Sequence, residues 1–121
     1  MLDAAILCLA LNGYHESRGE SLLGQMAVAQ VVLNRAGRDP AKVCGVVQER
    51  AQFSWTLKPP PVKDEAAYRH ARDVATVALH TNDFTGGATF YHAISILPYW
   101  RADLQVTGQW GNHIFYKRKG K

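Results

Sequence analysis

The sequence predicts an α+β fold that is mostly α, with about four helices and a small antiparallel β element in the C-terminal half. Three observations predict it. Apolar segments dominate residues 4–36, small apolar residues recur at helical spacing in residues 65–81, and glycines with aromatic residues follow residue 86. The 121 residues, 47% of them hydrophobic and 20% charged, suffice for one core. We therefore expect a single domain covering residues 1–121.

The first two helices are predicted on either side of a glycine. Asp3 can cap a helix that begins at residue 2 or 3 and ends at about residue 18, with Gly19 as its C-terminal stop. A second helix is expected from residue 20 or 21 to about residue 36. Most of residues 22–33 are apolar, and a helix that is apolar nearly all round lies buried at the centre of a fold.

Two further helices flank a proline-rich segment. Pro40, a favoured first-turn residue, begins a helix that ends near residue 50. Residues 52–64 are expected to be irregular, because three successive prolines exclude a helix. Asp64 then caps a helix that reaches about residue 81.

The C-terminal part of the chain predicts strands. The segment "GGATFYHA" (residues 86–93) indicates a strand after a glycine turn. The segment "LQVTGQWGNHIFYKR" (residues 104–118) indicates two short strands around Gly108 and Gly111.

The charge and hydropathy restrict the classes of partner. A formal net charge of +4 and a pI near 9.3 suit an acidic polymer such as nucleic acid, anionic lipid or bacterial cell wall. No run reaches the roughly 18 apolar residues of a membrane helix, so stable membrane insertion is not expected. The apolar segment 4–11 follows Asp3 instead of a basic region, which indicates a buried helix and no visible export signal.

Cysteine and histidine spacing predicts no metal site and no cofactor. Cys8 and Cys44 lie in apolar helical segments, so buried free thiols are the preferred interpretation, and a disulfide is left open. None of the five histidines has zinc-ligand spacing. No phosphate-binding glycine loop and no nucleophile-elbow motif is present.

The stretch "YHESRGESLLGQ" (residues 14–25) carries two glutamates of different expected character. Glu16 falls in the last turn of the first helix, where the negative end of the helix dipole and apolar neighbours disfavour a charged carboxylate. A glutamate held protonated in this way can act as a general acid. Arg18 opposes this effect. From the local pattern alone, a solvated surface glutamate is the preferred interpretation of Glu16.

Glu20 is more readily explained by structure. "SRGE" (residues 17–20) has the spacing of a capping box, in which Glu20 reaches back to a free amide at the start of a helix. Such a box makes Ser17 the N-cap of the second helix. It also places Glu16 just before the positive end of that helix, which weakens the general-acid argument.

Aromatic residues in two other segments are suited to binding a sugar ring or a base. "QFSW" (residues 52–55) puts Phe53 and Trp55 beside Ser54 in an irregular stretch, where an anchor in the core is the alternative. "FYH" (residues 90–92) alternates along a strand, so Tyr91 faces opposite to His92. One face belongs to the core and the other is a candidate for a cleft.

Taken together, these segments resemble a cell-wall hydrolase family that includes the catalytic domain of spore cortex-lytic enzymes. That family has an E-A-R-G-E segment, then G-Q and an apolar helix ending in L-N-R. The matching segments occur here in the family's order: "ESRGE" (16–20), "GQMAVAQVVLNR" (24–35), "QFSW" (52–55), "ATFYH" (88–92) and "GNHIFY" (111–116). Each is weak alone, but five in order along nearly the whole chain form a strong signal. Ser17, where the family usually has Ala, makes an "ES" pair similar to that of many lytic transglycosylases.

The resemblance implies a lysozyme-like fold, a peptidoglycan substrate and Glu16 as the catalytic acid. It maps the family's cleft onto five residues: Phe53, Ser54, Trp55, Tyr91 and His92. It implies a metal-free enzyme that cleaves between N-acetylmuramic acid and N-acetylglucosamine. Because no acidic residue besides Glu20 is close to Glu16 in sequence, a lytic transglycosylase giving 1,6-anhydro products is preferred to a muramidase-type hydrolase with a second carboxylate.

The resemblance also sets the expected setting of the protein. We expect a monomer that acts on the wall, in the periplasm or outside the cell, without nucleic acid as its partner. With no signal peptide visible, a phage endolysin made in the host cytoplasm and released by a holin-like partner fits, as does a domain of a larger secreted enzyme. The alternatives in other functional classes are a non-catalytic wall-binding module and a basic nucleic-acid-binding domain.

Overall fold

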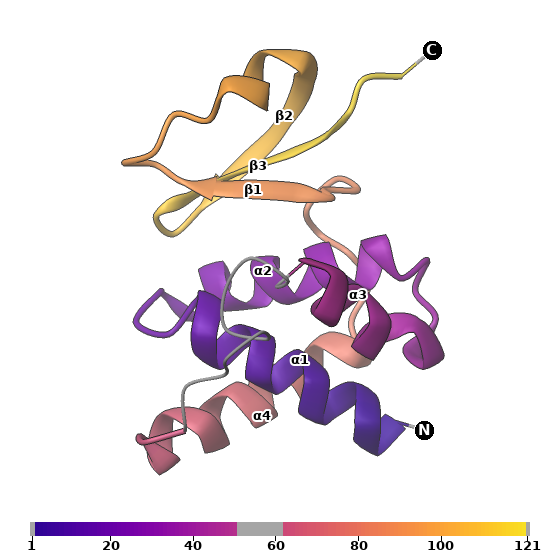
Figure 1. Ribbon diagram of the computed structural model, residues 1–121, viewed down its shortest axis with the longest axis vertical. Helices are drawn as coiled ribbons and strands as arrows, with labels where there is room; N and C mark the ends of the chain where they lie inside the picture. Colours follow the sequence, from indigo (N-terminus) through magenta and orange to yellow (C-terminus); the bar gives the residue numbers. More distant parts are fainter. Residues whose placement is uncertain (1, 51–61, 121) are drawn as a thin grey trace.

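The computed structural model describes residues 2–50 and 62–120, which form a helical layer with a three-stranded sheet over it (Figure 1). The helices are α1 (Leu2–Glu16), α2 (Leu22–Arg35), α3 (Val43–Arg50) and α4 (Glu65–Leu79), with short 3-10 helices η1 (Pro40–Lys42) and η3 (Tyr99–Asp103). The strands are β1 (Phe90–Ala93), β2 (Leu104–Trp110) and β3 (His113–Arg118). The predicted α+β class, with four helices and a C-terminal antiparallel sheet, is confirmed. None of the helices in the described residues is long and apolar enough to cross a membrane.

Helix α2 is apolar nearly all round because it lies between two cores. Ala29, Val32 and Leu33 pack into a cluster that joins α2 to α1, α3 and α4. Val28 and Val31 pack on the opposite side against Phe115 of the sheet. Figure 1 shows α2 between the sheet and α1. The predicted central, buried second helix is therefore confirmed.

The junction between α1 and α2 differs from the predicted capping box. Helix α1 ends at Glu16, and the hydroxyl of Ser17 donates to the Gly13 carbonyl oxygen at 3.0 Å, so Ser17 is not an N-cap. Ser21 caps α2, because its Oγ accepts from the Gly24 amide at 3.1 Å. Gly19 follows α1 with φ +91°, a conformation that glycine adopts without strain.

A disulfide between Cys8 and Cys44 joins α1 to α3, with the two Cα atoms 5.2 Å apart. The free-thiol interpretation is wrong. Both segments are apolar because they face the shared core, and the packing of α1 against α3 there brings the two cysteines into bonding range. Sequence separation alone contains no information on that distance.

The sheet is antiparallel with the order β1-β3-β2. The turn between β2 and β3 contains Gly111, at φ +61°. The two short strands expected around Gly108 and Gly111 are present, but Gly108 lies inside β2 at a β-bulge and not in the turn. The Trp110 ring folds over Gly108, where a Cβ would lie 2.5 Å from the ring carbon Cη2. Glycine is required here by a side chain and not by a turn.

The segment before β1 is held by Asp83. Its Oδ1 accepts from the Thr85 amide at 2.9 Å and from the Thr85 hydroxyl at 2.6 Å, and its Oδ2 accepts from the Gly87 amide at 2.7 Å. Burial opposes ionisation, but these hydrogen bonds outweigh it and the pKa of Asp83 is lowered. The side-chain amide of Asn34, on α2, donates to the Ala88 carbonyl at 2.9 Å. This hydrogen bond fixes where β1 starts relative to the helical layer.

Candidate active site

Glu16 is the last residue of α1, and its side chain is half-buried. Within residues 2–50 and 62–120, no hydrogen bond or ion pair engages its carboxylate. The side chain thus stands at the negative end of a helix dipole, and no cation of the described residues forms an ion pair with it. A carboxyl group placed in this way is available to donate and to accept a proton.

His15, directly before Glu16, has a pKa below its ordinary value. Burial lowers the pKa of the imidazole, because the charged ring would lose contact with water, and the positive charge of Arg18 lowers it further. Arg18 itself donates to the Tyr14 hydroxyl and lies over the Tyr14 ring, with 4.5 Å from its guanidinium carbon to the ring centroid. Arg18 is therefore directed to Tyr14, which removes the objection that it neutralises Glu16.

Glu20 fastens the helical layer to the sheet. Its Oε1 accepts from the Asn112 amide at 2.7 Å, and its Oε2 accepts from the Asn112 side-chain amide at 3.4 Å. His113 Nδ1 lies 3.5 Å from the same Oε1. Gly111 has no Cβ that could collide with this carboxylate. Glu20 thus has a structural role, and its partner is the β2–β3 turn. The capping box predicts a different partner, a free amide at the start of a helix.

His113, which lies beside Glu20, contacts Tyr91 on the inner face of the sheet, the face that packs against α2. The His113 side chain is buried, and its ring centroid lies 5.3 Å from that of Tyr91. The Tyr91 ring lies 5.7 Å from Phe115 and packs against the cluster under α2. Sequence reasoning did not select Asn112 or His113 as site residues, although both occur in the matching segment "GNHIFY".

His92 lies on the opposite face of β1 from Tyr91, as the alternation predicts. It is buried between Trp100 and Tyr116, with ring centroids 5.7 and 5.3 Å away. Its Nδ1 donates to the Ala93 carbonyl at 2.8 Å, so in the neutral ring Nε2 accepts from the Tyr116 hydroxyl at 2.7 Å. The structure therefore does not bring His92 and Tyr91 to the same side of the sheet. Phe53, Ser54 and Trp55 lie outside the described residues.

The site is suited to acid–base chemistry by one carboxylate. Glu16 is unengaged within the described chain, whereas Glu20 is held by the sheet. In the same residues, no group of three or more His, Cys, Asp or Glu side chains could hold a metal ion. The arrangement defines a small α+β domain with a candidate proton donor, Glu16, at the end of a helix.

Comparison with known proteins gives the family. The chain belongs to the cell wall hydrolase family, whose model matches residues 19–116. It is 39% identical over 93 residues to a spore cortex-lytic enzyme of Halalkalibacterium halodurans, which is 74% of this chain and 27% of that protein. It is 35% identical over 114 residues to the spore cortex-lytic enzyme of Bacillus cereus, 86% of this chain and 40% of that protein. The chain therefore spans about a quarter to two fifths of these relatives.

Solved structures carry the same fold. The catalytic domain of the Bacillus cereus SleB protein superposes with a TM-score of 0.73 at 31% identity, over 95% of this chain and 91% of that chain. The catalytic domain of the germination-specific lytic transglycosylase SleB from Bacillus anthracis gives 0.72 at 32% identity, over 93% of both chains. The resemblance noted in the sequence is confirmed. The family match begins at Gly19, three residues after Glu16, so it does not include the candidate acid.

Proposed function

We propose that this domain cleaves the glycan strands of peptidoglycan between N-acetylmuramic acid and N-acetylglucosamine, as a lytic transglycosylase. One observation carries the proposal: Glu16 is a carboxylate without a partner among the described residues, and Glu20, the nearest acidic residue in sequence, is bonded to Asn112. Residues 51–61, which the structure does not describe, contain no Asp or Glu. The similarity to a domain called a lytic transglycosylase supports the same reaction.

A one-carboxylate site accounts for the chemistry if the substrate supplies the second group. Glu16 donates its proton to the glycosidic oxygen, and the bond from this oxygen to C1 of the muramic acid breaks. The N-acetyl group of that sugar stabilises C1. The muramic 6-hydroxyl then attacks C1 and returns its proton to Glu16. The products are a 1,6-anhydromuramic end and a free 4-hydroxyl, and no water is consumed.

Aromatic residues would hold the sugars. Tyr91 is half-buried beside His113 on the inner face, and we assign it, with Phe53, Ser54 and Trp55, to the substrate. Both ring nitrogens of His92 are engaged, so we assign this residue to holding β1 in place. The net charge of +4 favours approach to an anionic wall. The disulfide supports action outside the reducing cytosol, in the periplasm or beyond the cell.

Mass spectrometry of a digest tests the proposal. Purified peptidoglycan is digested, half of the product is treated with borohydride, and the masses are compared, with Glu16→Gln protein as the blank. Anhydro ends are one water lighter than hydrolase products and do not gain two hydrogens. Fragments that all gain two hydrogens would refute the transglycosylase and indicate a muramidase-type hydrolase. No fragments at all, with the protein still bound to the wall, would indicate a non-catalytic binding module.

A further inference from the structure

The loop that follows β1 exposes large apolar side chains. It covers residues 94–99, with the sequence "ISILPY", and runs from the end of β1 into the first residue of η3. Tyr99 is 90% exposed, Leu97 68% and Ile96 59%, and Ile94 is exposed as well. Figure 1 shows the loop projecting beyond the end of β1. Single exposed apolar residues are common, but four large ones in a six-residue loop mark a surface for a partner. We call residues 94–99 the apolar loop.

Both ends of the apolar loop are fixed to the sheet. At one end, the Ile94 amide donates to the Asn112 carbonyl at 2.9 Å. At the other end, Trp100 follows Tyr99 directly and packs its ring against that of Tyr116, with the ring centroids 5.6 Å apart. Trp100 thus takes the place next to the sheet, and the apolar side chains before it stay exposed.

Two exposed cations lie at the base of the apolar loop. Arg101 Nη1 donates to the Pro98 carbonyl at 3.3 Å, and Lys119 Nζ donates to a backbone carbonyl of η3 at 3.1 Å. Within the described residues, no carboxylate lies within ion-pair distance of either cation. Asp103 is the only acidic residue of 84–121, a stretch that contains five Lys or Arg. The base of the loop is therefore positively charged.

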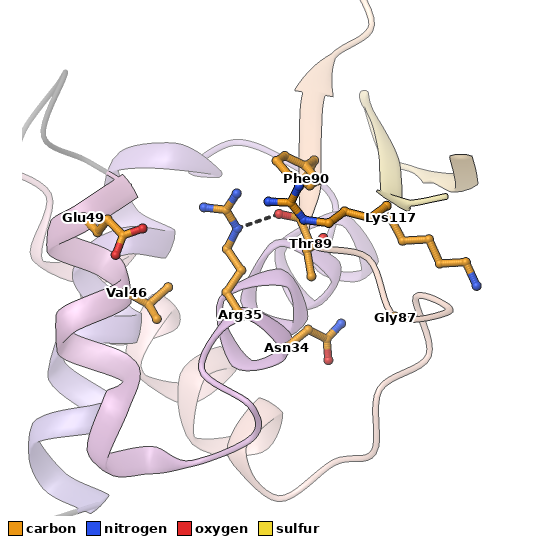
Figure 2. A pocket seen from close by; sticks show the side chains of 9 residues that line it. Asn34, Arg35, Val46, Glu49, Gly87, Thr89, Phe90 and Lys117 are labelled. Carbon is orange, nitrogen blue, oxygen red and sulfur yellow. Dashed lines mark hydrogen bonds between the residues drawn. The ribbon is translucent and has the colours of Figure 1, made fainter. Parts of the chain in front are cut away.

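The apolar loop is separate from a cavity of about 520 Å³ between α2, α3 and the edge of the sheet (Figure 2). Phe90, at the start of β1, lines that cavity, whereas the loop follows Ala93 at the other end of the strand. No residue of the loop lines the cavity, and Figure 2 shows the Lys117 side chain directed away from it. The loop thus offers a protruding surface and not a wall of this cavity.

We propose that the apolar loop docks the protein on the surface of a bilayer that carries anionic lipid head groups. Ile96 and Leu97 would enter the boundary between head groups and acyl chains, where an apolar segment is buried without spanning the membrane. Tyr99 would lie at the level of the head groups, because it combines an apolar ring with a polar hydroxyl. Arg101 and Lys119, at the base of the loop, would meet the lipid phosphates.

The character of the exposed side chains favours lipid over a sugar or a rigid partner. Three of the four are aliphatic, and they offer neither a ring face nor a polar group to the hydroxyls of a sugar. A fluid bilayer can surround a protruding loop on all sides, whereas a rigid partner covers one side. The cations at the base supply the charge complementarity that an anionic surface requires.

Docking would also set the position of the candidate active site. The hydrogen bond from Ile94 to Asn112 joins the apolar loop to the turn that Glu20 holds. Glu16 lies four residues before Glu20, so a docked protein would hold this junction near the membrane. The glycan strands closest to the membrane would then be the ones within reach. The contact with lipid itself does not depend on the proposed function.

Sedimentation with vesicles tests the inference without catalysis. At low salt, the protein should bind vesicles of phosphatidylcholine with phosphatidylglycerol, bind phosphatidylcholine alone much more weakly, and be released by added salt. Ile96→Ser/Leu97→Ser should lower the partition coefficient by at least about tenfold, because two large apolar side chains are no longer buried. Leu7→Ser/Val77→Ser removes two exposed apolar side chains from α1 and α4 and should leave the partition coefficient unchanged.

A second pair of variants tests the cations. Arg101→Gln/Lys119→Gln should weaken binding to the anionic vesicles by at least about fivefold. Arg69→Gln/Arg72→Gln makes the same change of charge at exposed positions on α4 and should have no effect. Thermal unfolding of each variant confirms that the fold is kept, since every substituted side chain is exposed.

Three results would overturn the inference. They are the absence of vesicle binding at low salt, equal weakening by the loop variants and their controls, and loop variants that keep vesicle binding but lose binding to the wall or a self-association of the wild type. Glu16→Gln protein should bind vesicles as the wild type does. Anhydro products without vesicle binding would overturn this inference alone, and vesicle binding without any turnover of peptidoglycan would overturn the proposed function alone.

Discussion

Glu20→Gln separates the two roles that a second glutamate near the site could play. In the structure, Glu20 receives hydrogen bonds from the Asn112 amide and side chain and lies 3.5 Å from His113 Nδ1. Glutamine keeps one oxygen for the Asn112 amide. Its NH2 group would then take the place of Oε2 and face the Asn112 side-chain NH2 group, which is a donor and cannot accept from it. The substitution thus replaces a charge-assisted contact with a neutral one and leaves a second contact unmade.

The expected cost follows from these contacts. A hydrogen bond to a charged group contributes about 1.5–3 kcal/mol, and a neutral one about 0.5–1.5 kcal/mol. Their difference is about 1–1.5 kcal/mol, and the 3.4 Å contact adds a few tenths at most. We therefore expect Glu20→Gln to lower the free energy of unfolding by about 1–2 kcal/mol. For a domain of this size, that corresponds to a fall in Tm of roughly 4–8 °C.

Thermal unfolding and a product assay on the same sample give the test. Glu49→Gln is the stability control, because Glu49 is exposed and engages in no ion pair within the described residues. The folded fraction of Glu20→Gln should retain wall-cleaving activity and give the same anhydro products. A loss of activity of a hundredfold or more with an unchanged Tm would refute the structural role. It would make Glu20 the second carboxylate of a hydrolase.

Three further predictions concern other parts of the molecule. Glu16→Gln should keep the fold by circular dichroism and lower peptidoglycan clearing by at least about a hundredfold, because it removes the proton donor; near-native clearing would exclude Glu16 as the acid. Cys8→Ala/Cys44→Ala should lose about 4 kcal/mol in denaturant unfolding, the loop-entropy value for a separation of 36 residues, and reductant should lower the wild type equally. Asp83→Asn should cost about 1–3 kcal/mol at neutral pH, since an amide cannot accept from both Thr85 and Gly87. Because the pKa of Asp83 is lowered in the folded state, its contribution to the free energy of unfolding is present above pH about 4 and is lost as the pH falls further. The variant should therefore lose less stability than the wild type on acidification. A stability curve parallel to that of the wild type would contradict this.

Much of the helical layer could be predicted from local pattern. The apolar sequence of α2 indicated a buried central helix, and Asp64 caps α4 as expected, with its Oδ1 accepting from the Ala67 amide at 2.9 Å. These features depend on residues close together in the chain, so a reader of the sequence has all of their causes at hand. The matching segments, which spread along the chain, were sufficient to indicate the family.

Contacts between distant residues were decided only by the tertiary structure. Glu20 and Asn112 are 92 positions apart, and a carboxylate that fits a local capping box is instead bonded to a hairpin turn. Cys8 and Cys44 form a disulfide because α1 packs against α3. Gly108 lies in a strand, and the Trp110 ring occupies the space that a side chain at this position would need.

The sequence by itself determined the elements and the α+β class, because helix ends, strand alternation and hydrophobic periodicity are local properties. The glutamate to suspect came from the resemblance of the matching segments to a family and not from the local pattern, which favoured a solvated surface residue. Tertiary packing decided which of the two glutamates, four residues apart, has no partner among the described residues. It also placed Arg35 and Arg118 on one aromatic ring, although they are far apart in the chain. The physical reason is that the state of a carboxylate or a guanidinium depends on the partners within a few ångströms, and those partners come from other segments of the folded chain.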